Sequence, residues 1–148
     1  MITIKEAKQF IGDHANEGVN CPCCGQLCVI YKRRLHAEMA IFLIKLVKEF
    51  RRTRTWVHVN TISKKKCSDG MYLIQWGLII RKPKLKGDEK TSGLYKPTDE
   101  GIDFAMNQTV VPSFAWLFDK RVIEFSSETV NIVKALGTKF DYQDLMNT

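Results

Sequence analysis

Residues 76–101, WGLIIRKPKLKGDEKTSGLYKPTDEG, contain the pattern that decides the fold. Two short strand-like runs flank a polar segment that holds a Gly-Asp pair. The spacing of the apolar residues and these turn residues together predict a β-hairpin with a long, basic tip. Thr98, Asp99 and Glu100 then favour a helix over residues 99–107, because an N-cap hydroxyl and first-turn acids complement exposed amides.

Three helical segments are predicted before this hairpin. Residues 56–62 indicate a short helix, or a strand that leads into one, and residues 70–78 predict another helix with candidate N-caps at Ser68 and Asp69. Residues 35–50 predict the longest helix, because their apolar side chains recur at helical spacing along one wide face. These apolar residues are Leu35, Met39, Phe42, Leu43, Leu46, Val47 and Phe50.

The order of three helices, a hairpin and a helix is that of a winged helix-turn-helix, in which the third helix enters the DNA major groove. Two details resemble many winged-helix families. In WGLI, Gly77 ends the third helix and the next residues open the hairpin, or wing; GLYKPTDEG resembles the return strand with its Tyr-x-x-Thr-x-x-Gly ending. The alternative is another small α+β domain with the same order of elements. We therefore predict an α+β fold with a winged-helix-like domain at residues 35–107.

Two further parts are predicted on either side of that domain. Residues 1–34 form an N-terminal helix and a cysteine knuckle, since Thr3 and Glu6 match a capping box at the start of residues 4–15. A turn-rich loop at residues 18–25 and a short strand, CVIYKRR, follow.

Residues 108–148 are predicted to form a hairpin and a helix that pack on the central domain as a docking or homodimerisation unit. VVPSFAWLFDKRVIEF indicates two strands joined at its Asp-Lys pair. A helix over residues 126–137 is expected to begin at Ser126 or Ser127 and to end at Gly137. The first strand alternates three aromatic residues on one face: Phe114, Trp116 and Phe118.

Four of the five cysteines lie within the eight residues CPCCGQLC. A reducing compartment and the odd number of thiols disfavour disulfides, and clustered cysteines there more often bind metal. Cys21 and Cys24 form a C-x-x-C pair, and Gly25 permits a tight turn that points amides toward a thiolate. We predict a structural zinc site, which needs four ligands; buried or incidental thiols are the alternative. Cys28 is a candidate third ligand at C-x3-C spacing, and the candidates for the fourth are His14, His36 and Cys67.

The net charge of +7 is unevenly distributed along the chain. Residues 29–97 contain 17 Lys or Arg against 5 Asp or Glu, a net charge of +12, and the remaining residues carry −5. Such segregation indicates that the middle of the chain meets a polyanion; a solvated basic surface is the alternative. The predicted phosphate contacts are Lys64, Lys65, Lys66, Arg81, Lys82, Lys84 and Lys86. The predicted base contacts, on polar positions of the third helix, are Ser68, Tyr72 and Gln75.

Motifs for catalysis and for membranes were also sought. The sequence contains no P-loop, G-x-G-x-x-G or H-E-x-x-H motif. A His-Asn-His nuclease would require a further His after His58 to bind its metal, and the sequence has none there. An enzyme is therefore not predicted. The sequence also has no signal-peptide pattern and no run of about 18 apolar residues, so we expect a cytoplasmic protein without membrane contact.

The segments CPCCGQ, YKRRL, WVHV, WGLI, KPTDEG and KFDYQDLM, in this order, resemble small phage and prophage proteins that join a cysteine knuckle to a winged-helix-like body. The likeness runs from about residue 18 to the end. It implies a viral setting in the host cytoplasm and zinc at Cys21 and Cys24. Our first hypothesis is a DNA-binding transcription regulator whose partner is duplex DNA. The second is an effector that binds a host protein or ribonucleoprotein through its aromatic hairpin and basic surface.

Overall fold

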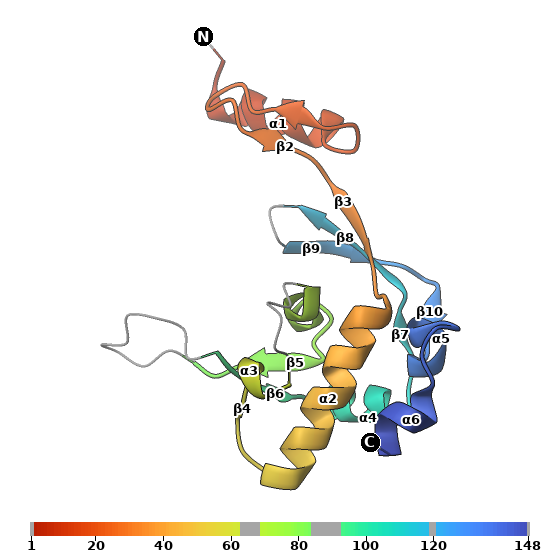
Figure 1. Cartoon of the computed structure of the whole chain (residues 1–148). Helices are drawn as coiled ribbons and strands as arrows, with labels where there is room; N and C mark the ends of the chain where they lie inside the picture. The colour runs from red at the N-terminus through yellow and green to blue at the C-terminus, as the bar shows by residue number, and fades with distance from the viewer. Residues whose placement is uncertain (1, 63–68, 84–92, 119–120, 148) are drawn as a thin grey trace. The chain divides into compact units, whose positions relative to one another are not determined.

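The structure is a computed structural model, in which residues 2–62, 69–83, 93–118 and 121–147 are described (Figure 1). It combines helices with small antiparallel sheets, which confirms the α+β class. The chain divides into two compact units: unit 1 is Met1–Arg34 with Phe114–Ser127, and unit 2 is Leu35–Ser113 with Glu128–Thr148. The predicted boundary after residue 34 coincides with a unit boundary, whereas the predicted part 108–148 is divided between the two units.

Unit 1 contains one helix and two small antiparallel sheets within the described residues. Helix α1 begins with the predicted capping box: the Glu6 amide donates to Thr3 Oγ1 at 3.1 Å, and the Thr3 amide donates to Glu6 Oε2 at 3.3 Å. One sheet pairs β1 with β2, and the other has the order β3-β8-β9. The elements are α1 (Ile4–His14), β1 (Val19–Asn20), β2 (Leu27–Cys28), β3 (Tyr31–Arg34), β8 (Phe114–Phe118) and β9 (Arg121–Phe125).

Unit 2 is built around one long helix, α2 (Ala37–Thr53), which confirms the helix predicted over residues 35–50. Its sheets have the strand orders β4-β6-β5 and β7-β10. The strands are β4 (Val57–His58), β5 (Ile79–Arg81), β6 (Leu94–Pro97), β7 (Val111–Pro112) and β10 (Thr129–Val130). The other helices are α3 (Val59–Ile62), the 3-10 helix η1 (Asp69–Ile74), α4 (Asp99–Ala105), α5 (Ile132–Leu136) and α6 (Tyr142–Asn147).

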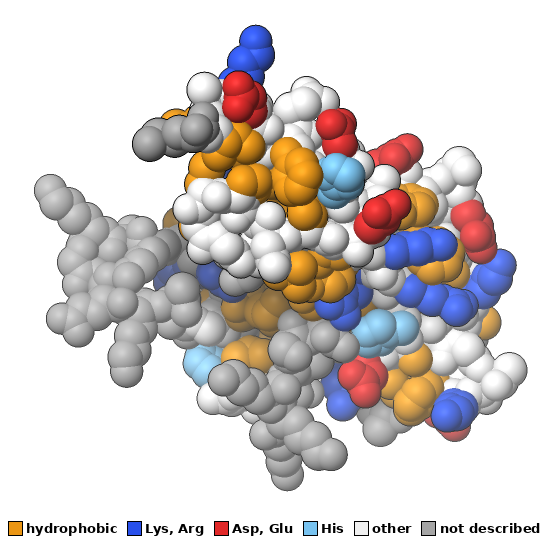
Figure 2. Space-filling view, turned by 90° about the horizontal axis from the view of Figure 1, so that it is seen from above, with side chains coloured by type: hydrophobic (Ala, Val, Ile, Leu, Met, Phe, Trp, Pro, Cys, Tyr) orange, Lys and Arg blue, Asp and Glu red, His pale blue; other side chains and the backbone are white. Residues whose placement is uncertain are grey.

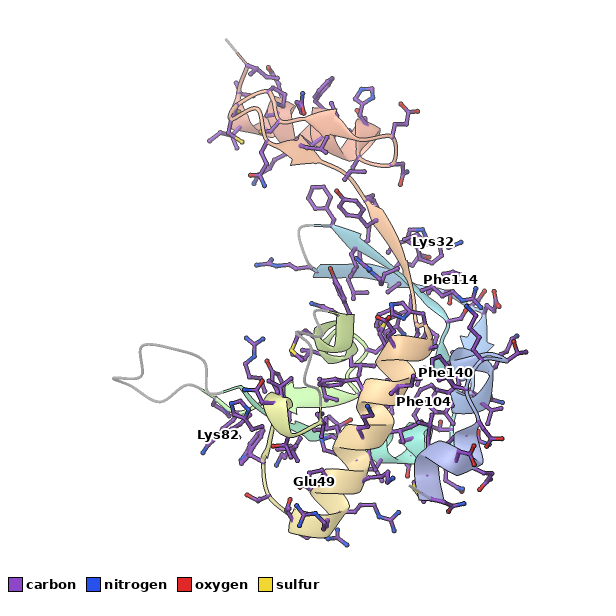
Figure 3. The ribbon with its side chains drawn as sticks, viewed as in Figure 1. Lys32, Glu49, Lys82, Phe104, Phe114 and Phe140 are labelled. Carbon is purple, nitrogen blue, oxygen red and sulfur yellow. The ribbon has the colours of Figure 1, made fainter. Side chains whose placement is uncertain are left out.

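The core of unit 2 surrounds α2. Contacts join α2 to η1, β6, α4, α5 and α6, and Figure 3 shows Phe104 of α4 beside α2. Seven side chains of α2 are buried, because its apolar residues occupy a wide stripe. They are Met39, Ala40, Phe42, Leu43, Ile44, Leu46 and Val47.

The third predicted helix is present as η1, a 3-10 helix rather than an α-helix. A 3-10 helix has three residues per turn, so residues three apart share one edge. Leu73 and Trp76 are buried at that spacing, and a Cβ added to Gly70 would come within 2.7 Å of the Phe42 ring. The close packing of this edge on α2 therefore favours the narrower helix.

The third helical segment ends at Gly77, as predicted. Gly77 has a φ of +74°, the Gly77 amide donates to the Ile74 carbonyl at 3.0 Å, and the Leu78 amide donates to the Leu73 carbonyl at 3.1 Å. This is the Schellman pattern, which needs a residue that tolerates positive φ. The chain then enters β5, which pairs antiparallel with β6, so the predicted hairpin is confirmed for its described strands.

The prediction for residues 126–137 is wrong at its start. Ser126 and Ser127 do not cap a helix: Thr129–Val130 form β10, and α5 begins after Asn131, whose side chain accepts from the Lys134 amide at 2.8 Å. The Ser126 hydroxyl instead accepts from the Phe114 amide at 3.1 Å. The predicted end at Gly137 is present, and a short helix, α6, follows it.

Among the described residues, no helix combines the length and the apolar character needed to cross a membrane. Large hydrophobic side chains are nevertheless exposed, and Figure 2 shows several on the face in view, with Lys and Arg side chains next to some of them. In unit 1 these exposed residues are Ile2, Ile4, Phe10, Leu27, Tyr31, Ile123 and Phe125.

Candidate nucleic-acid interface

The three-stranded sheet of unit 2 positions the predicted wing residues. The central strand β6 pairs with β5 on one side and with β4 on the other. The register places Tyr95 between Arg81 of β5 and Val57 of β4. Tyr95 is only 5% exposed, so its ring belongs to the core while its hydroxyl reaches the edge of the sheet.

Arg81 is held on this ring. Its guanidinium carbon lies 5.5 Å from the ring centroid of Tyr95, and its Nε donates to Tyr95 Oη at 3.2 Å. A cation over an aromatic face is attracted by the ring quadrupole, and the hydrogen bond restricts its orientation. Arg81 therefore presents a fixed, exposed positive charge at the end of β5.

Lys96 is a second cation supported by a ring. Its Nζ lies 4.8 Å from the ring centroid of Trp56, and the register places it opposite Ile80. Lys96 is not among the predicted contacts, although its alternation with Tyr95 in LYKP indicates that it lies on the other face of the strand. Lys82, labelled in Figure 3, follows β5 and its amide donates to the Leu94 carbonyl at 2.9 Å.

Two predicted base contacts are in the described part of the chain: Tyr72 lies within η1, and Gln75 directly follows it. Both are half-buried, and the Gln75 amide donates to the Tyr72 carbonyl at 2.9 Å. Their spacing of three residues places them on one edge of the 3-10 turn, away from the buried edge of Leu73 and Trp76. The other predicted contacts fall outside the described residues: Lys64, Lys65, Lys66, Ser68, Lys84 and Lys86.

The cysteine-rich loop forms a tight turn between β1 and β2 in unit 1. The Cys21 amide donates to the Gln26 carbonyl at 2.7 Å, and the Gly25 amide donates to the Cys21 carbonyl at 2.8 Å. Gly25 has a φ of +76°, which a side chain would strain, so the predicted role of this glycine in the turn is supported.

This turn directs backbone amides toward the Cys21 thiol. Amides of Cys24 and Cys23 lower the pKa of Cys21 because they favour its thiolate, and the Cys23 amide lies 3.4 Å from Cys21 Sγ. Thiolate is the form that binds metal. The Cys21, Cys23, Cys24 and Cys28 thiols are all free of disulfides.

The predicted zinc ligands are not brought together as a set. In the part of the chain that the structure describes, no group of three or more His, Cys, Asp and Glu residues could hold a metal ion. His14 ends α1 with its ring centroid 4.6 Å from that of Phe10, and Cys28 Sγ donates to the Gln26 carbonyl at 3.6 Å. His36 is the N-cap residue of α2 in unit 2, and Cys67 lies outside the described residues.

Comparisons with protein-family models, with curated proteins and with solved structures give no match to this chain.

Proposed function

We propose that unit 2 is a winged-helix domain that binds duplex DNA. The observation that carries the proposal is the strand order β4-β6-β5, with α2 before β4 and with α3 and η1 between β4 and β5. A winged helix needs three helices, a short strand after the first of them, and a hairpin wing that pairs with this strand. The hairpin β5/β6 and strand β4 supply the last two parts.

The cations on this sheet support the proposal. Arg81 and Lys96 are held over aromatic rings, and Lys82 follows at the end of β5. Lys and Arg that neutralise phosphates release condensed counterions, which drives binding and makes it steeply dependent on salt. The net charge of +12 over residues 29–97 fits such a partner.

In this proposal η1 approaches the major groove. Tyr72 and Gln75 lie on one edge of its 3-10 turn, and a Gln side chain can bind an adenine edge through two hydrogen bonds. The short 3-10 helix presents few base contacts, so we expect phosphate contacts to supply most of the affinity. Regulation of transcription, and the viral setting that the sequence resemblance implies, remain predictions.

The test is a titration of the full chain with a labelled duplex at two salt concentrations. Arg81→Gln should lower the salt dependence by about one phosphate contact, a change of about 0.9 in the slope of log K against log salt. The triple variant Lys64→Ala, Lys65→Ala, Lys66→Ala should lower it further. A matched control is Lys5→Ala with Lys8→Ala, which removes two exposed cations from α1 and should leave the slope unchanged.

Two results would overturn this proposal. One is the absence of duplex binding at low salt. The other is a salt slope that neither the Arg81 variant nor the triple lysine variant changes.

We also propose that Cys21 and Cys24 supply two of the four ligands of a structural zinc ion. The amides of Cys23 and Cys24 that stabilise the Cys21 thiolate support this, and so does the small size of the buried core in unit 1, since domains with little core often rely on a metal. Elemental analysis of protein purified without chelator should find zinc, which Cys21→Ser or Cys24→Ser removes and Cys23→Ser retains. Zinc near zero in the unaltered protein would reject the site.

A further inference from the structure

The sheet β3-β8-β9 of unit 1 has one face that displays a row of aromatic rings. Along β8, Ala115 and Leu117 are 0% and 4% exposed, whereas the alternating residues are half-buried. Successive side chains of a strand point to opposite faces, so these alternating residues share one face. They are Phe114, Trp116 and Phe118, and we call this side of the sheet the aromatic face.

Charged residues of β3 and β9 flank these rings, and the register of β8 with β9 shifts at an irregularity between Trp116 and Leu117. Strand β3 places Arg34 opposite Phe114 and Lys32 opposite Trp116. Strand β9 places Glu124 opposite Trp116 and Arg121 opposite Phe118. Directly opposite residues of antiparallel strands lie on the same face. The aromatic face therefore carries three cations and one carboxylate beside its three rings.

Lys32 connects the cations to the rings. Its Nζ lies 4.1 Å from the ring centroid of Phe114 and 5.5 Å from that of Trp116, and Figure 3 shows Lys32 and Phe114 close together. Both distances are within the range of cation–π attraction. This contact places a positive charge directly over two of the rings, where a phosphate that approaches the aromatic face would meet it.

We propose that the aromatic face binds single-stranded nucleic acid. Proteins that bind single strands combine rings, on which unpaired bases stack, with Lys and Arg that follow the phosphates, and exposed sheet faces are a common site for such rings. Rings spaced by two residues are about 7 Å apart, which suits neighbouring bases that are splayed apart rather than stacked on one another. The excess of cations favours a polyanion over a protein partner. This face lies in unit 1, so the inference does not depend on duplex binding by unit 2.

The test uses the full chain and labelled 12-nucleotide dT and rU probes at low salt, followed by fluorescence anisotropy. Trp116→Ala should weaken binding about 10-fold, the effect expected for the loss of one base–ring stack. Trp116→Phe keeps a ring and should stay within about 3-fold of the unaltered protein. The pair tests whether an aromatic ring at this position is needed, and circular dichroism checks that both variants fold.

Charge variants give an independent measurement on the same face. Lys32→Met should weaken binding and reduce its salt dependence, because one phosphate contact is lost. Glu124→Gln should strengthen binding about 2-fold, because it removes a negative charge beside the phosphates. Comparison of dT with rU decides whether DNA or RNA is preferred, since only rU carries a 2′-hydroxyl.

Three results would overturn the inference. The first is that neither probe binds. This includes the outcome in which the face binds a protein, and not a nucleic acid, through Phe114, Trp116 and Phe118. The second is equal affinity for Trp116→Ala and the unaltered protein. The third is loss of single-strand binding in the triple lysine variant but not in Lys32→Met. This last result would place the single strand on unit 2, so failure here is distinguishable from failure of the duplex proposal.

Discussion

Units 1 and 2 each contain a three-stranded antiparallel sheet, but they differ in what those sheets bury. In unit 2 the ring of Tyr95 is buried and only the cation that it supports, Arg81, reaches the surface. In unit 1 the rings of β8 are themselves half-exposed, and Lys32 lies over two of them. The contact of Arg81 therefore presents charge over a buried ring, whereas the contact of Lys32 places charge beside half-exposed rings.

The two units also differ in the size of their cores. Among the described residues, the buried hydrophobic side chains of unit 1 are few and mostly small: Ala7, Ala15, Ala115 and Leu117. Unit 2 buries the large ones, including Phe104 and most of α2. Because burial of apolar area is the main stabilising term in folding, we expect unit 2 to be the more stable unit. Unit 1 then depends more on local hydrogen bonds and, if the proposals above hold, on bound zinc or nucleic acid.

Hydrogen exchange tests this difference most directly and should give the largest effect. Amides of β8, the central strand of unit 1, should exchange about 1,000-fold faster than those of Leu43 and Ile44 in α2, because only the latter require global unfolding. NMR or mass spectrometry on chelator-treated protein measures the ratio of the exchange rates in β8 and α2. Added zinc should lower this ratio, because a ligand that binds only the folded state of unit 1 stabilises that state. Equal rates in α2 and β8 would show that the units unfold together.

Two glycines provide the next test, because their surroundings are opposite. A Cβ at Gly101 in α4 would lie 2.0 Å from the Leu78 carbonyl oxygen, a backbone atom that also accepts from the Thr98 amide. We expect Gly101→Ala to lower the free energy of unfolding of unit 2 by about 3 kcal/mol. A Cβ at Gly12 in α1 would meet nothing within 4 Å, so Gly12→Ala should stabilise unit 1 by up to about 1 kcal/mol.

Urea unfolding followed by circular dichroism measures both glycine variants. If Gly101→Ala does not lower the free energy of unfolding, there is room for a Cβ between Gly101 and the Leu78 carbonyl oxygen, and the close contact is contradicted.

The local elements were predicted from the sequence because their signals are local. The Thr3–Glu6 capping box, the apolar stripe of α2 and the turn at Gly77 each lie within a few neighbouring residues, and each is present. Pairing between distant segments carries no comparable signal. Nothing within YKRR indicates that β3 pairs with β8, which makes unit 1 discontinuous along the chain.

The candidate site was predicted less completely for the same reason. Arg81 was identified from its position in a basic hairpin, whereas the support of Lys96 by Trp56 depends on an approach across the sheet that the sequence does not specify. The 3-10 form of η1 was missed because it follows from packing of Gly70 on Phe42. Tertiary contact in these cases overrides local propensity.

The helix caps of the two units provide a smaller test. Thr98 Oγ1 accepts from the Gly101 amide at 3.0 Å and donates to the Gly77 carbonyl at 2.7 Å, so it joins α4 to the turn before β5. Thr3 only caps α1 and is exposed. Thr98→Ala should therefore cost about 2 kcal/mol of unfolding free energy and Thr3→Ala about 0.5 kcal/mol. Serine at either position should restore most of the loss, and equal costs would contradict the additional role of Thr98.

The smallest effect is expected at high pH and only in unit 2. Tyr142 Oη donates to the Ala105 carbonyl at 2.5 Å, which ties α6 to the end of α4, and burial raises the pKa of Tyr142. A raised pKa means that the folded state favours the neutral phenol, so this stabilisation is present below the ordinary tyrosine pKa of about 10 and is lost as pH rises through the folded value. Urea unfolding between pH 8 and 11 should therefore show unit 2 losing stability faster in the unaltered protein than in Tyr142→Phe, which cannot ionise. This hydrogen bond of Tyr142 involves no part of unit 1. After correction for the intrinsic effect of hydroxide on exchange, the amides of β8 should therefore show the same pH dependence in the unaltered protein and in Tyr142→Phe. A difference between the two proteins would show that the two units share their stability.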